Sequence, residues 1–195
     1  MKFKLITAVV AATFAGSVAA KDVSYNNASI GWAQSTFDVD GGSDVDLDGI
    51  SGGLSFDLAK NWYLKLDATK QSGEESGIDL DMDLTTVNLG FNTAVSANTD
   101  FIAELGYARS DVEANFGGFS SSEDDSAANA VLGFRGMATD NFEWGASVQH
   151  MDFDDSLTFL NLEGRYFFTD TFSIGLEGKF ESDVNIYALE ARFDF

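Results

Sequence analysis

Alternation of apolar and polar residues in the last part of the chain is the feature that most limits how it can fold. In segments 172–180 and 187–195 nearly every second residue is apolar, and the residues between are small, polar or charged. Because successive side chains of a β-strand point to opposite faces, this period of two indicates strands with one apolar and one polar face. The same alternation occurs in 62–69 and 142–149. The sequence therefore predicts an all-β protein.

Connections of two kinds separate the alternating segments. Short turns place small and polar residues directly before an aromatic residue, at 59–62, 98–101, 139–142 and 169–172. Longer stretches are acidic and rich in Gly and Ser, near residues 40–44, 71–77, 114–125, 152–156 and 181–184. Short turns at one end and long loops at the other are typical of transmembrane barrels. We predict an antiparallel up-and-down transmembrane β-barrel of ten strands, with eight strands as the alternative if the first or last hairpin is misassigned.

The placement of aromatic residues favours a membrane barrel over a soluble β-sandwich, which would also alternate. Aromatic residues stand at the strand ends and the terminus, namely Trp62, Phe101, Phe142, Phe172 and Phe195. Such girdles mark the two interfaces of a membrane barrel. No segment after residue 20 is apolar over the roughly eighteen residues that a transmembrane helix needs. Pro, which interrupts sheet hydrogen bonding, is absent.

The first twenty residues have the pattern of a secretory signal peptide. Lys2 and Lys4 precede a mostly apolar stretch at 5–15, and small residues at 18–20 offer a cleavage site. We expect residues 1–20 to be removed and residues 21–195 to form the barrel domain, so that the mature chain has no transmembrane helix. An uncleaved membrane anchor is the alternative.

Charge and composition exclude several functions. With 32 acidic and 11 basic residues the chain has a net charge of −21, which would repel phosphates, so we expect no nucleic-acid partner. There is no Cys, which excludes disulfides, thiol nucleophiles and cysteine metal sites. The single histidine, His150, has no recognisable nucleophile and orienting partner, so we do not expect an enzyme.

The alternating end of the chain resembles the signal that the barrel-assembly machinery reads in outer-membrane proteins. Its residues are Tyr187, Leu189, Ala191, Phe193 and Phe195. The mature chain is similar to the small, porin-family outer-membrane β-barrels of proteobacteria, among them OmpX-like proteins and the family first described as activators of a rice immune receptor. This resemblance implies the outer membrane of a Gram-negative bacterium, contact with its lipid and lipopolysaccharide, and no characterised enzymatic site. The only functional residue it carries over is Phe195.

Continuing each strand in phase from its lipid-facing residues places charged side chains in the lumen. This predicted lumen charge network comprises Lys65, Asp67, Glu104, Arg135, Glu143, Glu163, Arg165, Glu177, Lys179, Glu190 and Arg192. The signs are mixed, and an unpaired charge in a narrow lumen is costly, so we expect pairing between strands. Barrels of about eight strands are filled by side chains, whereas open channels have about sixteen. We therefore favour a packed, charge-paired lumen over a selectivity-lined channel.

Toward the long loops the pattern inverts. Carboxylates then fall on the outer face, including Asp44, Asp46, Asp48, Asp79, Asp81 and Asp83. Apolar residues fall on the inner face, namely Phe37, Val39, Val45, Leu47, Leu80, Met82, Leu84, Val112, Met151 and Phe153. The segments 44–58 and 79–95 also exceed the ~9–11 residues that cross a bilayer. We predict a barrel that continues beyond the membrane with an apolar interior and an acidic exterior.

These patterns predict a small structural or porin-family barrel with a charge-paired lumen and an acidic extracellular extension. The alternative is a binding or conduit protein for a small hydrophobic molecule held in the apolar upper barrel. No tightly bound cofactor is expected, but the outward carboxylates are expected to hold Ca²⁺ or Mg²⁺ loosely and to bridge to lipopolysaccharide. The run from Asp44 to Asp48 is not an EF-hand, because the twelfth position of that frame is Ser55 rather than Glu.

Overall fold

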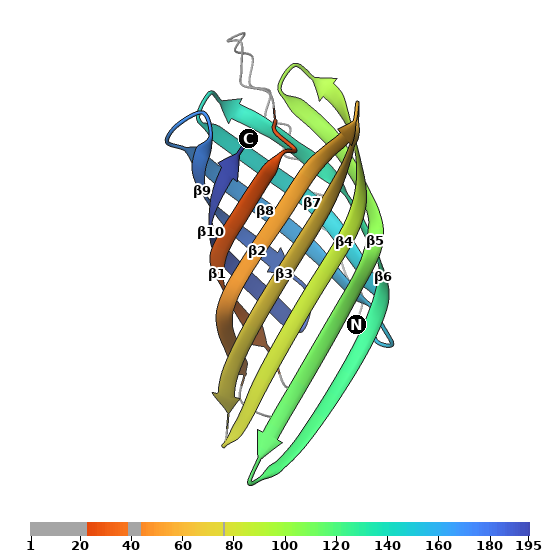
Figure 1. The fold of residues 1–195 in the computed structure, drawn as a ribbon, viewed down its shortest axis with the longest axis vertical. Helices are drawn as coiled ribbons and strands as arrows, with labels where there is room; N and C mark the ends of the chain where they lie inside the picture. Colours follow the sequence, from red (N-terminus) through yellow and green to blue (C-terminus); the bar gives the residue numbers. More distant parts are fainter. Residues whose placement is uncertain (1–22, 39–43, 76) are drawn as a thin grey trace, which may run out of the picture.

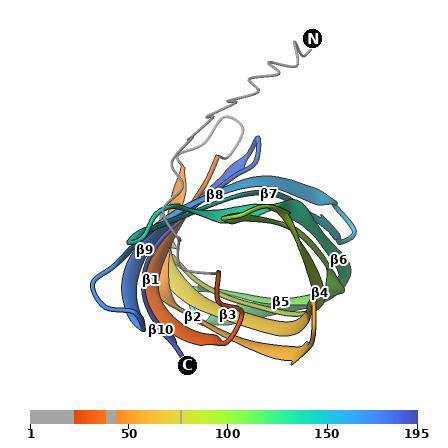
Figure 2. The same ribbon diagram turned by 90° about the horizontal axis from the view of Figure 1, so that it is seen from above.

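Ten antiparallel strands close into one barrel, which confirms the predicted fold and strand number. The computed structural model of the protein describes residues 23–38, 44–75 and 77–195, so the expected signal peptide and Val39 lie outside the described residues. The strands are β1 (Asn27–Phe37), β2 (Val45–Ala59), β3 (Trp62–Glu75), β4 (Ile78–Ser96), β5 (Thr99–Phe116), β6 (Phe119–Thr139), β7 (Phe142–Asp152), β8 (Leu157–Phe167), β9 (Phe172–Phe180) and β10 (Val184–Asp194). Each strand pairs with its neighbours in sequence, and β1 pairs with β10 to close the ring (Figures 1 and 2). The described residues contain no helix long and apolar enough to cross a membrane.

The short turns and the C-terminus lie together at one end, at the top of Figure 1. Asparagines at three of these turns bind the next hairpin, because each side-chain amide donates to a backbone carbonyl there. The pairs are Asn61 with Asn92 (2.7 Å), Asn98 with Met137 (2.6 Å) and Asn141 with Phe167 (3.1 Å). In each pair the backbone N–H of the partner donates in return to the carbonyl of the asparagine. The polar residues in the turn sequences thus join neighbouring hairpins.

At the opposite end the strands have very unequal lengths. β4, β5 and β6 have 19, 18 and 21 residues, whereas β7 to β10 have 9 to 11. The pairing of β6 with β7 ends at Ala128 and Asp152, so the rest of the β5–β6 hairpin projects beyond the ring (Figure 1). The extension is therefore a curved sheet open on one side. This corrects the expectation of a closed apolar barrel above the membrane.

Two stretches predicted as long loops are strands instead. Most of 71–77 and of 114–125 is paired in the β3–β4 and β5–β6 hairpins. The β5–β6 turn needs only Gly117 and Gly118, whose φ angles of 56° and 87° suit glycine in a two-residue hairpin turn. The Ser-rich and acidic composition of 71–77 and 114–125 suggested loops, but backbone hydrogen bonds to the partner strand stabilise both stretches as sheet.

The outer face of the ring is apolar, as a lipid-facing surface must be. Large side chains such as Leu105, Leu176 and Ile30 remain about two-thirds exposed. Aromatic rings pair near the short turns, where Trp62 lies 5.2 Å from the ring of Phe91 and Phe101 lies 5.6 Å from that of Phe134. An apolar belt that is bounded by aromatic side chains fits the bilayer.

Candidate functional site in the barrel lumen

The end of the lumen near the short turns contains a tightly paired group of charges. Arg192 on β10 donates to both carboxylate oxygens of Glu143 on β7, at 2.9 and 3.0 Å. Arg135 on β6 donates to the same Glu143, and Arg192 also lies 2.8 Å from a carboxylate oxygen of Asp194. Glu143 is only 1% exposed. Because β7 and β10 are separated in the ring by β8 and β9, the ion pair between Arg192 and Glu143 connects strands that are not neighbours.

The other charges of the predicted network also face the lumen, and each has a charged or hydrogen-bonding neighbour. Arg165 lies 2.8 Å from Glu163 and 3.4 Å from Glu190. Glu104 accepts a hydrogen bond of 2.7 Å from the hydroxyl of Tyr63. The remaining pairs are Lys65 with Asp67 (3.2 Å) and Lys179 with Glu177 (3.7 Å). The structure therefore brings together the residues that strand parity assigned to the lumen.

Four side-chain amides form a hydrogen-bonded chain along the inner wall that was not anticipated. Asn129 donates to Asn88 (2.8 Å), Gln149 donates to Asn129 (3.0 Å), and Asn161 donates to Gln149 (3.3 Å). The link between β4 and β6 passes over β5 at Gly106, where a Cβ atom would collide with the side chain of Asn88. This neutral network extends the charge network through the lumen toward the extracellular end.

The residues before β1 fold into the short-turn end of the lumen (Figure 2). Tyr25 is buried there, and its hydroxyl donates to Asp100 at 2.9 Å. Its ring lies 4.6 Å from that of Tyr63, and the guanidinium of Arg135 lies 5.3 Å from the ring centroid of Tyr25. We call Tyr25 and its contacts the periplasmic plug. Alternation could not reveal it, because residues 23–26 precede the first strand.

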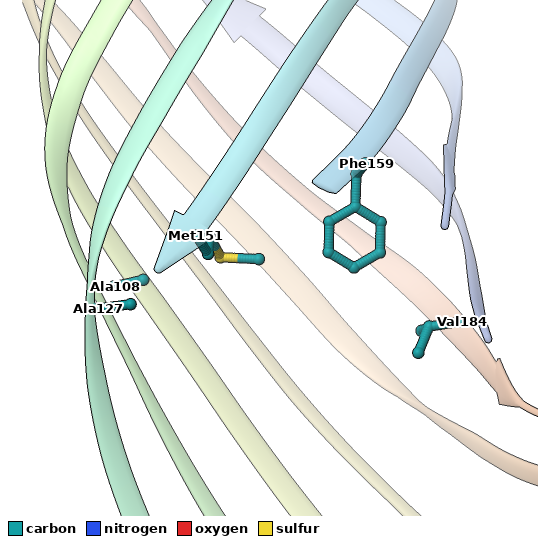
Figure 3. Packing of buried hydrophobic residues seen from close by; sticks show 5 residues of the cluster. All are labelled: Ala108, Ala127, Met151, Phe159 and Val184. Carbon is teal, nitrogen blue, oxygen red and sulfur yellow. The ribbon is translucent and has the colours of Figure 1, made fainter. Parts of the chain in front are cut away.

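On the extracellular side of the polar lumen, apolar side chains from one part of the wall form a cluster that we call the apolar collar. It consists of Ala108, Ala127, Met151, Phe159 and Val184, which come from five strands (Figure 3). Phe37, Phe153, Leu157 and Ile186 pack against it. Met151 was predicted to point inward, but Phe159 was missed, although it alternates with the lipid-facing Leu160 and Leu162. The collar lies at the end of the lumen that faces the extracellular extension.

The other residues of the predicted apolar interior differ in their burial. Leu47 is buried, and Met82 and Leu84 line the cavity of the lumen. Val45 and Leu80 are half-buried. Val112 is 40% exposed, contrary to the expectation of an excluded interior. The reason is that β5 there belongs to the open sheet, with no wall opposite it.

A cavity of about 190 Å³ lies in the lumen between the plug and the collar. Its lining runs from Tyr25 and Tyr63 to Met151 and Phe159. Hydroxyl and charged groups line the middle of the cavity, among them Ser29, Ser51, Lys65, Asp67, Glu177, Lys179 and Glu190. A cavity of ~150 Å³ can hold a benzene-sized molecule, so this one has room for a small solute.

The acidic outer face contains local pairs rather than a chelating centre. Asp83 lies 2.9 Å from Lys70, and Asp46 accepts a hydrogen bond of 2.7 Å from Thr36. Within the part of the chain that the structure describes, no three acidic, His or Cys side chains are grouped so as to hold a metal ion. Beyond the bilayer, two hydrogen bonds from Arg109 hold the pKa of the Asp111 carboxyl below its ordinary value.

A closed antiparallel ring with an apolar exterior and a charged interior defines a transmembrane β-barrel of the Gram-negative outer membrane. The family model of the outer membrane protein beta-barrel domain matches residues 5–180, and the chain belongs to this family. The solved structure of Ail, the attachment invasion locus protein of Yersinia pestis, is similar with a TM-score of 0.51 and 18% identity, over 87% of this chain and 97% of that chain. The outer membrane protein OprG from Pseudomonas aeruginosa matches with a TM-score of 0.47 and 12% identity, over 90% and 99%. At 18% identity the structure of Ail supports only the fold. No curated protein matches the chain.

Proposed function

We propose that this porin-like outer-membrane barrel is a structural protein whose lumen is closed to solutes. The observation that carries the proposal is the ion pair between Arg192 and Glu143, which connects non-neighbouring strands across the lumen. Both side chains are buried, and a charged pair in such surroundings is held firmly because separating it leaves uncompensated charge. The periplasmic plug packs against Arg135, which also binds Glu143.

The dimensions of the barrel support the same proposal. Ten strands are close to the number at which side chains fill a barrel, and far from the roughly sixteen of open porins. The apolar collar supports the same proposal, because apolar side chains in a narrow lumen disfavour water and ions. We assign the protein no catalytic role.

Solute uptake by proteoliposomes tests this function. Liposomes that contain the purified mature protein should swell in glycerol or small sugars no faster than protein-free liposomes. Liposomes with an established general porin provide the positive control. Swelling at a porin-like rate would contradict the proposal.

The alternative function, storage or passage of a small hydrophobic molecule, has weaker support. The collar side chains contact one another, and Phe159 and Ala108 are almost fully buried, so they form a core. The cavity below them carries charged groups that would disfavour an apolar ligand. Binding of one fluorescent apolar probe per protein, and loss of that binding in Phe159→Ala, would favour this alternative.

We further propose that residues 1–20 are cleaved during export, and that the barrel-assembly machinery inserts the chain through its terminal strand. The outer-face carboxylates would meet the anionic lipopolysaccharide through loosely bound Ca²⁺ or Mg²⁺, which reduces repulsion between like charges. N-terminal sequencing of the protein from outer membranes tests the cleavage. A mature chain that begins at Lys21 is expected, and retention of Met1 would contradict it.

A further inference from the structure

The charged residues of the lumen fall into two groups that differ in burial. Arg165 and Arg192 have side chains only 4% and 5% exposed, and their ion pairs are short. Lys65 and Lys179 have side chains 41% and 28% exposed, and both line the cavity. Arginine suits fixed, bidentate pairing, whereas the lysine ammonium is a mobile, strongly hydrated point charge. The arginines therefore brace the wall, and the lysines face the cavity.

Glu177 is the least satisfied of the cavity carboxylates. Its nearest cationic atom is Nζ of Lys179 at 3.7 Å, which is too long for a hydrogen bond. In residues 23–38, 44–75 and 77–195, no donor forms a hydrogen bond with Glu177, although its neighbour on β8, Glu163, accepts one from Arg165 at 2.9 Å. β9 thus presents a carboxylate with free acceptor positions to the cavity.

Negative charge is in excess around this carboxylate. Arg135 and Arg192 line the short-turn end of the cavity, where Glu143 and Asp194 neutralise them. The remaining carboxylates that line the cavity are Asp67, Glu104, Glu163, Glu177 and Glu190, and the remaining cations are Lys65, Arg165 and Lys179. Uncompensated charge in a narrow, weakly solvated lumen attracts an opposite charge.

We infer that the lumen cavity is a binding site for a small organic cation with a primary ammonium group, held by Glu177. An ammonium group has three donors and no acceptor, which suits a carboxylate that has free acceptor positions. The volume of about 190 Å³ limits the ligand to a few carbon atoms. Binding requires that the ion enter the cavity from one end of the lumen, and it does not require passage through the whole barrel, so it is compatible with a lumen that solutes cannot cross.

Calorimetric titration of the mature protein in detergent with ethylammonium chloride tests the inference, with sodium chloride exchanged to keep ionic strength constant. Saturable binding is expected, and Glu177→Gln should weaken it by at least about tenfold, because the charged acceptor is lost. Glu181→Gln removes a carboxylate of the β9–β10 loop instead, and should leave binding unchanged. The heat-dependent shift in gel mobility that folded barrels show would verify that each variant is folded.

A second variant tests the cavity itself without changing Glu177. Ala188→Leu fills the cavity from β10 while every charge is retained, and it should also abolish binding. Three outcomes would overturn the inference: no saturable heat with ethylammonium, equal affinity for sodium, or tighter binding of the zwitterion β-alanine. Undiminished binding by both folded variants would contradict it as well.

Discussion

Arg192 and Glu143 form a bidentate ion pair between β10 and β7, with nitrogen–oxygen distances of 2.9 and 3.0 Å. The two strands are separated in the ring by β8 and β9. The pair is therefore a cross-lumen brace, whereas most other ion pairs among the residues that the structure describes connect the same or adjacent strands. Its position next to the periplasmic plug makes it central to both stability and closure of the barrel.

Removal of one partner of this brace should destabilise the barrel strongly. Arg192→Met leaves Glu143 with Arg135 alone in a buried site, and the expected loss is about 3–5 kcal/mol of unfolding free energy. Urea unfolding in detergent measures it. Arg109→Met breaks the exposed pair with Asp111 and should cost much less, because water screens an exposed ion pair. Equal losses in the two variants would contradict the role of the brace.

A methyl group at Gly106 should disrupt the chain of amides. Its Cβ would collide with the side chain of Asn88 and with the backbone of Val87, so Gly106→Ala is expected to cost about 1–3 kcal/mol. Gly145→Ala, also on the inner face, adds a Cβ with no neighbour nearer than 3.5 Å and serves as the control. Thermal unfolding of both variants gives the comparison. Similar melting temperatures would show that the amide chain tolerates the methyl group.

Single cysteines should report which face each residue occupies in the extracellular part of the barrel. Cysteine at position 47 or 151 should react slowly with a bulky polar maleimide on intact cells, because these sites are buried. Cysteine at position 46 or 152 should react quickly. Cysteine at position 112 should also react quickly, although it faces inward, because the extension is open there. Fast labelling at 47 and 151 would be inconsistent with a closed collar.

Loss of the terminal residue should impair assembly. The backbone N–H of Phe195 donates to the carbonyl of Asn26 at 3.1 Å, and its ring lies 5.9 Å from that of Phe56. Deletion of Phe195 should therefore weaken recognition of the chain by the barrel-assembly machinery and closure of the barrel between β1 and β10. The amount of folded protein in outer-membrane fractions should fall. Secretion across the inner membrane should stay intact. Normal outer-membrane levels would refute this role.

Strand parity made much of the lumen predictable. Once Leu160 and Leu162 are assigned to lipid, Glu163 and Arg165 follow as lumen residues, and the same logic would have found Phe159. The periplasmic plug could not be foreseen, because Tyr25 lies outside any alternating segment and its contacts come from β3, β5 and β6. Neutral amides such as Asn129 gave no signal either, since their pairing depends on distances between strands.

The open extension was missed for a different reason. The composition of 114–125 suggested a loop, and strand length is set by backbone pairing, which polar side chains do not prevent. Alternation continues through Val112 in the correct phase, but phase alone cannot reveal that the opposite wall is missing. Burial on the inner face depends on the length of the strands across the lumen, and β7 to β10 are short.

Single-channel recording in planar bilayers tests the closed lumen most directly. The wild-type protein should give no steady conductance, because the periplasmic plug, the brace of Arg192 and Glu143, and the apolar collar lie in series. Tyr25→Ala combined with Phe159→Ala removes the aromatic side chains of the plug and the collar but leaves the brace, so it should give small openings only, while Tyr166→Ala, on the lipid-facing side of β8, should remain silent. Steady, porin-sized conductance from the wild-type protein would contradict the account.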